Sequence, residues 1–170
     1  MRLPIVSIKQ SEQEVKHDIH MMYIGIDPGF SGAWGMIDHN GKYQSCGDML
    51  HDELFILSHL VYAEIRQACE RQDVAVIIEA VHAMPKQGVS STFKFGMAYG
   101  AALSVAQRIN TNFHTVSPRV WKKALKLDSD KNLSLSMARD LWPAAPLARK
   151  KDNGRAEALL LAEYLRREHL

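Results

Sequence analysis

The sequence predicts an α/β fold in which helices cover both faces of one mixed five-stranded sheet. Three observations predict this class. Short apolar strands separated by turns open the organised part of the chain, and later strands alternate with amphipathic helices. Residues 73–79 form a run so rich in β-branched residues that this strand should be buried on both faces. The expected order is three strands, then helix, strand, helix, strand and three helices, with the core βββαβαβα.

The first three strands are expected to form an antiparallel meander. Residues 23–27 are short and apolar, and Pro28-Gly29 ends them with a turn. Residues 33–38 form the second strand, and Asn40-Gly41 is a strong signal for a two-residue hairpin. Residues 42–49 then return as the third strand.

The rest of the chain alternates helices and strands. Apolar residues recur at helical spacing in residues 54–70, and small residues in 92–108 permit close packing of that helix. Ser117-Pro118 suits a helix start, with serine at the N-cap and proline at the first position. The remaining predicted elements are a loop at 88–91, a strand at 113–116 and helices at 128–141 and from Asn153-Gly154 to about 167.

Length and composition favour a single domain in the cytoplasm. The 170 residues suit one domain, which is expected to span 22–170 after a flexible extension at 1–21. Two cysteines are too few for a disulfide framework and suit a reducing compartment. No apolar run is long enough to span a membrane, and the first residues lack the apolar segment of a signal peptide. Basic clusters at 119–126 and 149–155 suit either a polyanionic partner or an ordinary solvated surface.

Two carboxylates are expected to meet at one edge of the sheet. Asp27 ends the first strand and Glu79 ends the fourth, and a sheet of this order places those strands side by side and parallel. Carboxylates that are forced together repel each other unless a divalent cation lies between them. Asp27 could instead be an ordinary turn residue, but a buried and unpaired Glu79 would be costly. The pair therefore favours an acidic functional site.

The start of the last helix offers candidates for a third and a fourth ligand, Asp152 and Glu157. Glu157 shares a mostly apolar helix face with Leu160, Leu161 and Tyr164, which is unusual for an acid. Either acid could instead complement the dipole at the helix start. Together with the two strand acids they suit hard cations such as Mg²⁺, with two ions per site, in a phosphodiesterase. No histidine pair has the spacing of zinc ligands.

Several other side chains suit contact with DNA. His82, in the loop after the fourth strand, or Phe93 could stack on an unpaired base. Phe93 and Phe95 could also pack in the core, which we expect for one of them, and the three tryptophans are expected in the core. The residues expected to contact DNA are His82, Lys86, Lys94, Arg119, Lys122 and Lys123.

Three segments resemble the motifs of RuvC-type Holliday junction resolvases. Residues 23–29, Tyr-Ile-Gly-Ile-Asp-Pro-Gly, look like the first motif. Ile-Ile-Glu79, followed by a lysine-bearing loop and Phe-Lys-Phe-Gly, looks like the second, and residues 81–100 are similar to phage and prophage members. Residues 152–162 look like the C-terminal acidic helix. The resemblance covers about residues 23–167, and the combination is specific, whereas Asp-Pro-Gly alone is not.

The resemblance implies an RNase H-like fold and a homodimeric, Mg²⁺- or Mn²⁺-dependent endonuclease. Such an enzyme places paired, symmetric nicks in four-way or other branched DNA, here in a bacterial cytoplasm and with a phage or prophage origin. The helix at 93–108, with its small residues, is the expected dimer interface. The catalytic and metal-binding residues implied are Asp27, Glu79, Asp152 and Glu157.

The chain departs from this family at two places. Bacterial members usually carry an aspartate three residues before the last acid, where this chain has Gly154 and the nearest upstream acid is Asp152. They also carry an aromatic residue three positions after the second acid, where this chain has His82. The fourth ligand and base stacking at that place are therefore open questions.

Three alternatives remain at the level of the sequence. The same fold could serve a nuclease for flaps or for another duplex, because junction preference depends on shape and dimer geometry. The chain could also bind junctions without cutting them, although its four acids argue against this. Actin-like and sugar kinases begin with a similar Asp-Gly hairpin, but they need two such domains and about twice this length.

Overall fold

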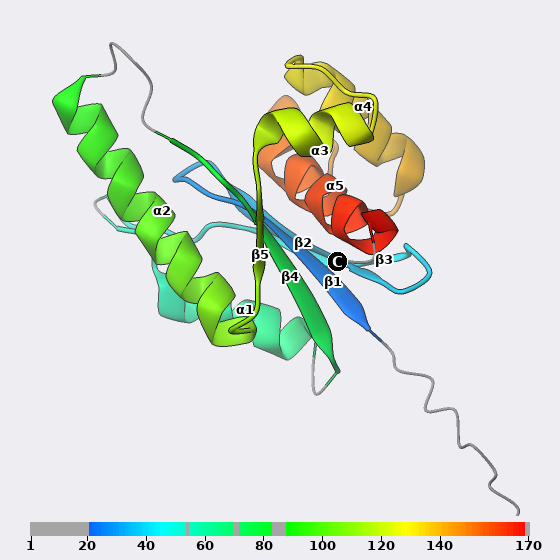
Figure 1. The fold of residues 1–170 in the computed structure, drawn as a ribbon, viewed down its shortest axis with the longest axis horizontal. Helices are drawn as coiled ribbons and strands as arrows, with labels where there is room; N and C mark the ends of the chain where they lie inside the picture. Colours follow the sequence, from blue (N-terminus) through cyan, green and yellow to red (C-terminus); the bar gives the residue numbers. More distant parts are fainter. Residues whose placement is uncertain (1–20, 54, 70–71, 83–87, 169–170) are drawn as a thin grey trace, which may run out of the picture.

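The computed structural model describes residues 21–168 except 54, 70–71 and 83–87 (Figure 1). The strands are β1 (Met22–Asp27), β2 (Ala33–Asp38), β3 (Tyr43–Asp48), β4 (Val74–Glu79) and β5 (His114–Val116). The helices are α1 (Ser58–Cys69), α2 (Val89–Ile109), α3 (Pro118–Ala124), α4 (Lys131–Leu141), the 3₁₀ helix η1 (Lys150–Asp152) and α5 (Asn153–Glu168). The predicted α/β class and the predicted order of strands and α-helices are confirmed.

The five strands form one mixed sheet in the order β3-β2-β1-β4-β5. β1, β2 and β3 are the predicted antiparallel meander, and β4 runs parallel to both β1 and β5. Ile26 of β1 lies opposite Ile78 of β4. Asp27 and Glu79 therefore end neighbouring parallel strands at the same edge of the sheet, as the strand order predicted.

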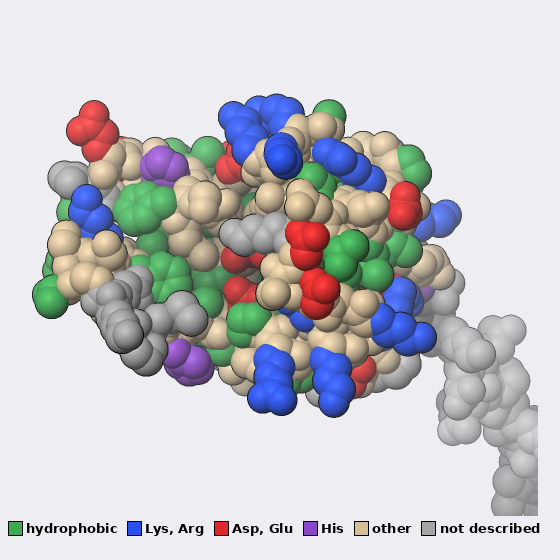
Figure 2. All heavy atoms as spheres, turned by 90° about the horizontal axis from the view of Figure 1, so that it is seen from above, with side chains coloured by type: hydrophobic (Ala, Val, Ile, Leu, Met, Phe, Trp, Pro, Cys, Tyr) green, Lys and Arg blue, Asp and Glu red, His purple; other side chains and the backbone are tan. Residues whose placement is uncertain are grey.

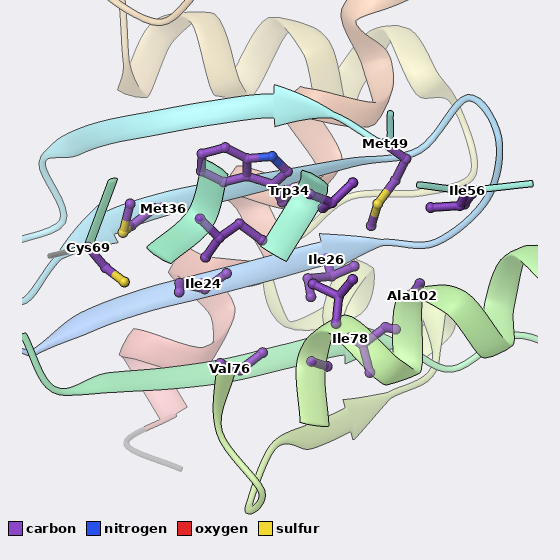
Figure 3. Packing of buried hydrophobic residues seen from close by; sticks show 14 of the residues in the cluster. Ile24, Ile26, Trp34, Met36, Met49, Ile56, Cys69, Val76, Ile78 and Ala102 are labelled. Atoms are coloured by element: carbon purple, nitrogen blue, oxygen red, sulfur yellow. The ribbon is translucent and has the colours of Figure 1, made fainter. Parts of the chain in front are cut away.

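Helices cover both faces of the sheet (Figure 1). α1 and α2 lie on one face, where Ile24, Ile26, Val76 and Ile78 contribute to a shared core (Figure 3). α3, α4 and α5 lie on the other face, where Ile77 joins the second core. Because successive side chains of a strand point to opposite faces, the apolar run of β4 is buried from both sides.

Two glycines let α5 lie directly against the centre of the sheet. A Cβ atom built on Gly25 would stand 2.0 Å from the carbonyl oxygen of Ala158. A Cβ atom built on Gly35 would stand 2.7 Å from the backbone nitrogen of Leu159. Side-chain carbons do not approach backbone atoms this closely, so only glycine fits. α5 is buried along most of its length, and this brings Glu157 to the sheet.

Two helices begin later than the sequence predicted. α1 begins at Ser58 rather than at residue 54, because the preceding segment folds onto itself through a bridge between His51 and Ile56. α4 begins after Asp130 rather than at residue 128. The carboxylate of Asp130 accepts a hydrogen bond from the backbone of Asn132 and caps the helix.

α2 begins earlier than predicted, at Val89, inside the segment expected to be the loop 88–91. The amide of Thr92 donates to the carbonyl oxygen of Gly88 at 2.9 Å, and the Thr92 hydroxyl donates to the same oxygen at 3.1 Å. These hydrogen bonds to Gly88 form the first turn of the helix. Residues 89–91 are therefore helical and not part of a loop.

Two predictions concern the ends and the interior of the chain. Residues 1–20, most of the predicted flexible extension, lie outside the described residues. Trp34, Trp121 and Trp142 are all buried, as predicted. Within the described part of the chain, no helix combines the length and the apolar character needed to cross a membrane.

Candidate active site

A cavity of about 680 Å³ lies at the edge of the sheet where β1 and β4 end. Three carboxylates from three elements line it, namely Asp27 of β1, Glu79 of β4 and Glu157 of α5. Glu79 and Glu157 are only 8% and 7% exposed. Lys94 and Lys122 line the same cavity, which we call the acidic cavity. Figure 2 shows acidic side chains near the middle of one face of the molecule, with lysine and arginine side chains toward its edges.

The turn after β1 places Asp27 at this cavity. Gly29 has a φ of 130°, which other residues rarely adopt, so the chain reverses directly after Pro28. The amide of Gly32 donates to the carbonyl oxygen of Gly29 at 3.1 Å and closes the turn. Asp27, Pro28, Gly29 and Gly32 all line the cavity. The Asp-Pro-Gly turn seen in the sequence thus forms one wall of the site.

The side chain of Glu79 is held from α3. Trp121, which is fully buried, donates its Nε1–H to Oε1 of Glu79 at 2.8 Å. A buried carboxylate that lost this donor would keep the cost of leaving water without the compensating hydrogen bond. Trp121 therefore orients the carboxylate of Glu79 in the acidic cavity.

Glu157 is held by two side chains that also come from the helical layer. Nζ of Lys122 lies 2.7 Å from Oε1 of Glu157 in a largely buried ion pair. The buried hydroxyl of Ser134 donates to the same oxygen at 3.3 Å. Lys122 also lies against the ring of Trp121, with its Nζ 5.2 Å from the ring centroid. Two consecutive residues of α3 thus bind two different carboxylates of the site.

Asp152 does not line the acidic cavity. Its carboxylate, 3% exposed, accepts hydrogen bonds from the backbone nitrogen of Arg149 at 2.7 Å and from Nε and Nη2 of Arg149 at 3.0 and 2.7 Å. Burial disfavours the charged carboxylate, but the hydrogen bonds and the charge of Arg149 outweigh it and lower the pKa of Asp152. The structure places this residue in the turn before α5, and its role as a metal ligand stays a prediction.

Asp152→Asn is expected to lower the free energy of unfolding by about 2 kcal/mol near neutral pH, because the buried charge that binds Arg149 is lost. A carboxyl group whose pKa is lowered by folding stabilises the protein above its ordinary pKa of 3.8. That contribution disappears as the pH falls below this value, so the difference between wild type and variant should shrink in acid. Urea unfolding at neutral and acidic pH measures it, with exposed Asp140→Asn as control. A loss of equal size at both pH values would contradict the assignment.

The acidic cavity has the donor chemistry of a site for a hard divalent cation. Carboxylate oxygens are the ligands that Mg²⁺ and Mn²⁺ prefer, and three carboxylates line this cavity. Among the described residues, no three His, Cys, Asp or Glu side chains already form a metal-binding group. Glu79 and Glu157 accept hydrogen bonds from Trp121 and Lys122. The donor set fits the cation by its chemistry, although its side chains are bonded to protein donors here.

Gly154 lies beside Asp27, at the position where the family that the sequence resembles carries an aspartate. A Cβ atom built on Gly154 would stand 2.7 Å from the carbonyl oxygen of Ser31 and 3.4 Å from Oδ2 of Asp27. A side chain there would require the backbone at Ser31 to move. With Asp152 bonded to Arg149, neither position places a fourth carboxylate in the acidic cavity of this structure.

The residues predicted to contact DNA lie in separate places. Lys94 and Lys122 line the acidic cavity. Arg119 and Lys123, again with Lys122, line a groove of about 480 Å³ beside α3, which we call the α3 groove. His82 is exposed shortly after β4, and Lys86 lies outside the described residues. Three of the predicted cations thus lie in one groove next to the acids.

Two aromatic side chains of the acidic cavity, Phe30 and Phe95, were not predicted as site residues. Phe95 is half-buried at the cavity wall, and Phe93 is 66% exposed. Neither belongs to the two core clusters, so the expectation that one of them packs in the core was wrong. The position of Phe30 directly after Asp-Pro-Gly is the sequence signal that could have identified it.

The sequence matches no family model and no curated protein. The structure, in contrast, matches solved structures of RuvC from Thermus thermophilus. One, in complex with a Holliday junction substrate, has 20% sequence identity and a TM-score of 0.60, and the match covers 88% of this chain and 96% of the RuvC chain. Another has 19% identity and a TM-score of 0.61, with 88% and 97% covered. At these identities the likeness shows the fold, and the chain therefore has the RNase H-like fold of RuvC, as the sequence motifs predicted.

Proposed function

We propose that the chain is a divalent-metal-dependent endonuclease that cuts four-way DNA junctions. The observation that carries the proposal is the convergence of Asp27, Glu79 and Glu157, from three elements, on one cavity at the carboxyl ends of parallel strands. A RuvC structure of the same fold holds a Holliday junction substrate. The cations of the α3 groove, next to the acids, support a polyanionic substrate.

The three carboxylates are the residues that would hold Mg²⁺ or Mn²⁺. When bound, such ions activate a water molecule and stabilise the departing oxygen of a phosphodiester. The net reaction adds one water across the P–O bond and leaves a 3′-hydroxyl and a 5′-phosphate. The chain contributes a partly desolvated acidic cavity, in which the attraction between carboxylate and cation is stronger than in water.

The other side chains of the cavity bind and orient. Trp121 and Ser134 fix the carboxylates of Glu79 and Glu157 through buried hydrogen bonds. Lys94 and Lys122 stand at the wall of the same cavity and bind the phosphate group of the strand that is cut. The ion pair between Lys122 and Glu157 keeps that lysine beside the acids before DNA arrives.

Trp121→Phe is expected to lower junction cleavage about tenfold and to raise the Mg²⁺ concentration needed for half-maximal cleavage. The phenyl ring keeps most of the buried volume, but the donor to Glu79 is lost. The matched control is Trp142→Phe, because Trp142 is also buried and donates its Nε1–H to the carbonyl oxygen of Gly41 at 2.9 Å, outside the acidic cavity. The same change in Mg²⁺ requirement in both variants would show that Trp121 acts through stability alone.

We also propose that two copies of the chain pair through α2. One face of this helix is exposed along its whole length, and its residues are Val89, Phe93, Gly96, Gly100, Ser104 and Gln107. Val89 and Phe93 are large apolar side chains that are 88% and 66% exposed. A Cβ atom on Gly96 or Gly100 would meet nothing within 4 Å, so a second helix can approach this face closely. Two acidic cavities in one dimer account for paired cuts.

Gly100→Arg is expected to convert the dimer to a monomer, because a charged side chain would stand in the middle of the α2 face. The substitution fits the fold of one chain, since a Cβ atom at Gly100 has no neighbour within 4 Å. Sedimentation velocity at micromolar concentration measures the change, with Ala63→Arg at an exposed site of α1 as control. A monomeric wild type, or a dimer that persists in Gly100→Arg, would remove this interface.

The experiment that tests the function compares a labelled four-way junction, a flap and a linear duplex of the same sequence. Each is incubated with the purified chain and Mg²⁺ or Mn²⁺, and with EDTA. Paired, symmetric nicks in the junction alone, absent with EDTA, are expected. Equal cutting of the flap or the duplex would leave a nuclease but remove the junction assignment. Binding without cutting under either metal would identify a junction-binding protein that is not an enzyme.

A further inference from the structure

A second cavity, of about 310 Å³, shares a wall with the acidic cavity. Phe30, Ser31 and Gly32, in the turn after β1, line both. The opposite wall of this second cavity comes from the end of β3, from the segment that follows it and from η1. We call it the flanking cavity. The turn after β1 therefore separates two adjacent cavities.

The flanking cavity has an aromatic wall. The rings of Phe30 and His51 meet edge to face, with their centroids 5.3 Å apart and an angle of 77° between their planes. Phe30 is half-buried and His51 is exposed. Nδ1 of His51 lies 2.8 Å from the carbonyl oxygen of Asp52, which holds the imidazole in place. Flat unsaturated rings at the mouth of a cavity are surfaces on which a nucleobase stacks.

The same cavity also has a cationic wall. The guanidinium of Arg149 is fixed by two hydrogen bonds to Oδ1 of Asp152, at 3.0 and 2.7 Å. Lys151 is exposed and lines the same cavity. The acid of the opposite wall, Asp48, is paired with Arg155 through contacts of 2.6 and 2.7 Å. Each carboxylate that lines the cavity thus has an arginine partner, and Lys151 adds a further positive charge.

We propose that the flanking cavity holds one nucleotide of the DNA strand that is cut, next to the phosphate in the acidic cavity. The base stacks on Phe30, whose ring lies nearly perpendicular to that of His51, and the phosphate faces Arg149 and Lys151. This combination of a ring surface with a fixed guanidinium and an exposed lysine suits a nucleotide. Because the two cavities share the turn after β1, neighbouring nucleotides of one strand can occupy them. The inference rests on the proposed function, because it places a second part of the same substrate.

The test measures binding of a labelled four-way junction by fluorescence anisotropy, without divalent cations so that no strand is cut. Lys151→Ala is expected to weaken binding about fivefold and to lower the slope of log Kd against log salt concentration by about one. Lys150→Ala is the matched control, because it removes the same charge from the neighbouring exposed residue, which lines neither cavity. It is expected to leave the affinity within about twofold.

A second comparison tests the base contact. Phe30→Leu is expected to weaken junction binding about fivefold. An abasic junction, which lacks the base next to the cut site, should bind wild type about fivefold more weakly than the intact junction does. Phe30→Leu should bind the abasic and the intact junction with equal affinity, because it has already lost the base contact. Circular dichroism confirms that each variant is folded.

The outcomes separate this inference from the proposed function. Equal weakening by Lys150→Ala and Lys151→Ala would overturn the phosphate site, since general charge would then explain the loss. Equal binding of the intact and the abasic junction by wild type would overturn the base site. In both cases junction binding and cleavage by wild type would still stand. A wild type that binds no branched DNA would remove both the function and the site.

Discussion

Asp27→Asn is expected to lower junction cleavage by about a thousandfold while the chain still folds and still binds the junction. Asparagine has almost the same shape as aspartate, but it cannot supply the negative charge that a divalent cation needs. Asp27 stands at the end of β1 in the cavity that Glu79 and Glu157 also line. Loss of one of three carboxylates therefore removes a large part of the charge of the site.

Single-turnover cleavage with enzyme in excess over junction measures the chemical step of Asp27→Asn, and titration calorimetry with Mn²⁺ measures cation binding without turnover. The matched control is Asp73→Asn, at an exposed position just before β4 and therefore at the opposite edge of the sheet. We expect wild-type cleavage and cation binding in the control. If Asp27→Asn cut the junction at the wild-type rate, the acidic cavity would not be the active site.

Much of the fold could be predicted because its signals are local in the sequence. The β-branched run at 73–79 is β4, and its burial on both faces follows from its composition. Asn40-Gly41 predicted a hairpin between β2 and β3, and the hairpin is present, but residues 39–42 connect the strands instead of the predicted two-residue turn; Gly41 has a φ of 78° there. Helix starts were harder, because hydrogen bonds such as that from Thr92 to Gly88 decide them and leave no strong pattern.

The candidate site could also be predicted only in part from the sequence. Strand order alone brings Asp27 and Glu79 to one edge, and the apolar face of α5 brings Glu157 to the same cavity. Asp152 lies elsewhere in the structure. Asp152 lies in η1, before the first residue of α5, and its carboxylate accepts hydrogen bonds from Arg149, so its spacing from Glu157 along a helix does not place it in the cavity. The contact between Trp121 and Glu79 joins residues 42 apart and arises only when α3 packs on the sheet, so no sequence pattern predicts it.

Gly25→Ala is expected to lower the free energy of unfolding by about 3 kcal/mol or more. The added methyl carbon would stand 2.0 Å from the carbonyl oxygen of Ala158, 2.6 Å from the backbone nitrogen of Ala162 and 2.7 Å from Cβ of Leu161. All three atoms belong to α5, and two of them are backbone atoms. No change of side-chain rotamer relieves such contacts, so α5 must move away from β1 or the chain must unfold.

Urea unfolding of Gly25→Ala measures this loss against Gly88→Ala. At Gly88, the N-cap of α2, an added Cβ meets nothing within 4 Å and the φ of −63° is open to any residue, so only the cost of alanine at an N-cap, about 1 kcal/mol or less, is expected. Equal midpoints for the two variants would mean that α5 does not lie this close to β1. Because α5 carries Glu157, any folded fraction of Gly25→Ala should also cut more slowly than wild type at equal junction binding. The close contact between Gly25 and the backbone of α5 therefore contributes both to the stability of the fold and to the position of Glu157 in the acidic cavity.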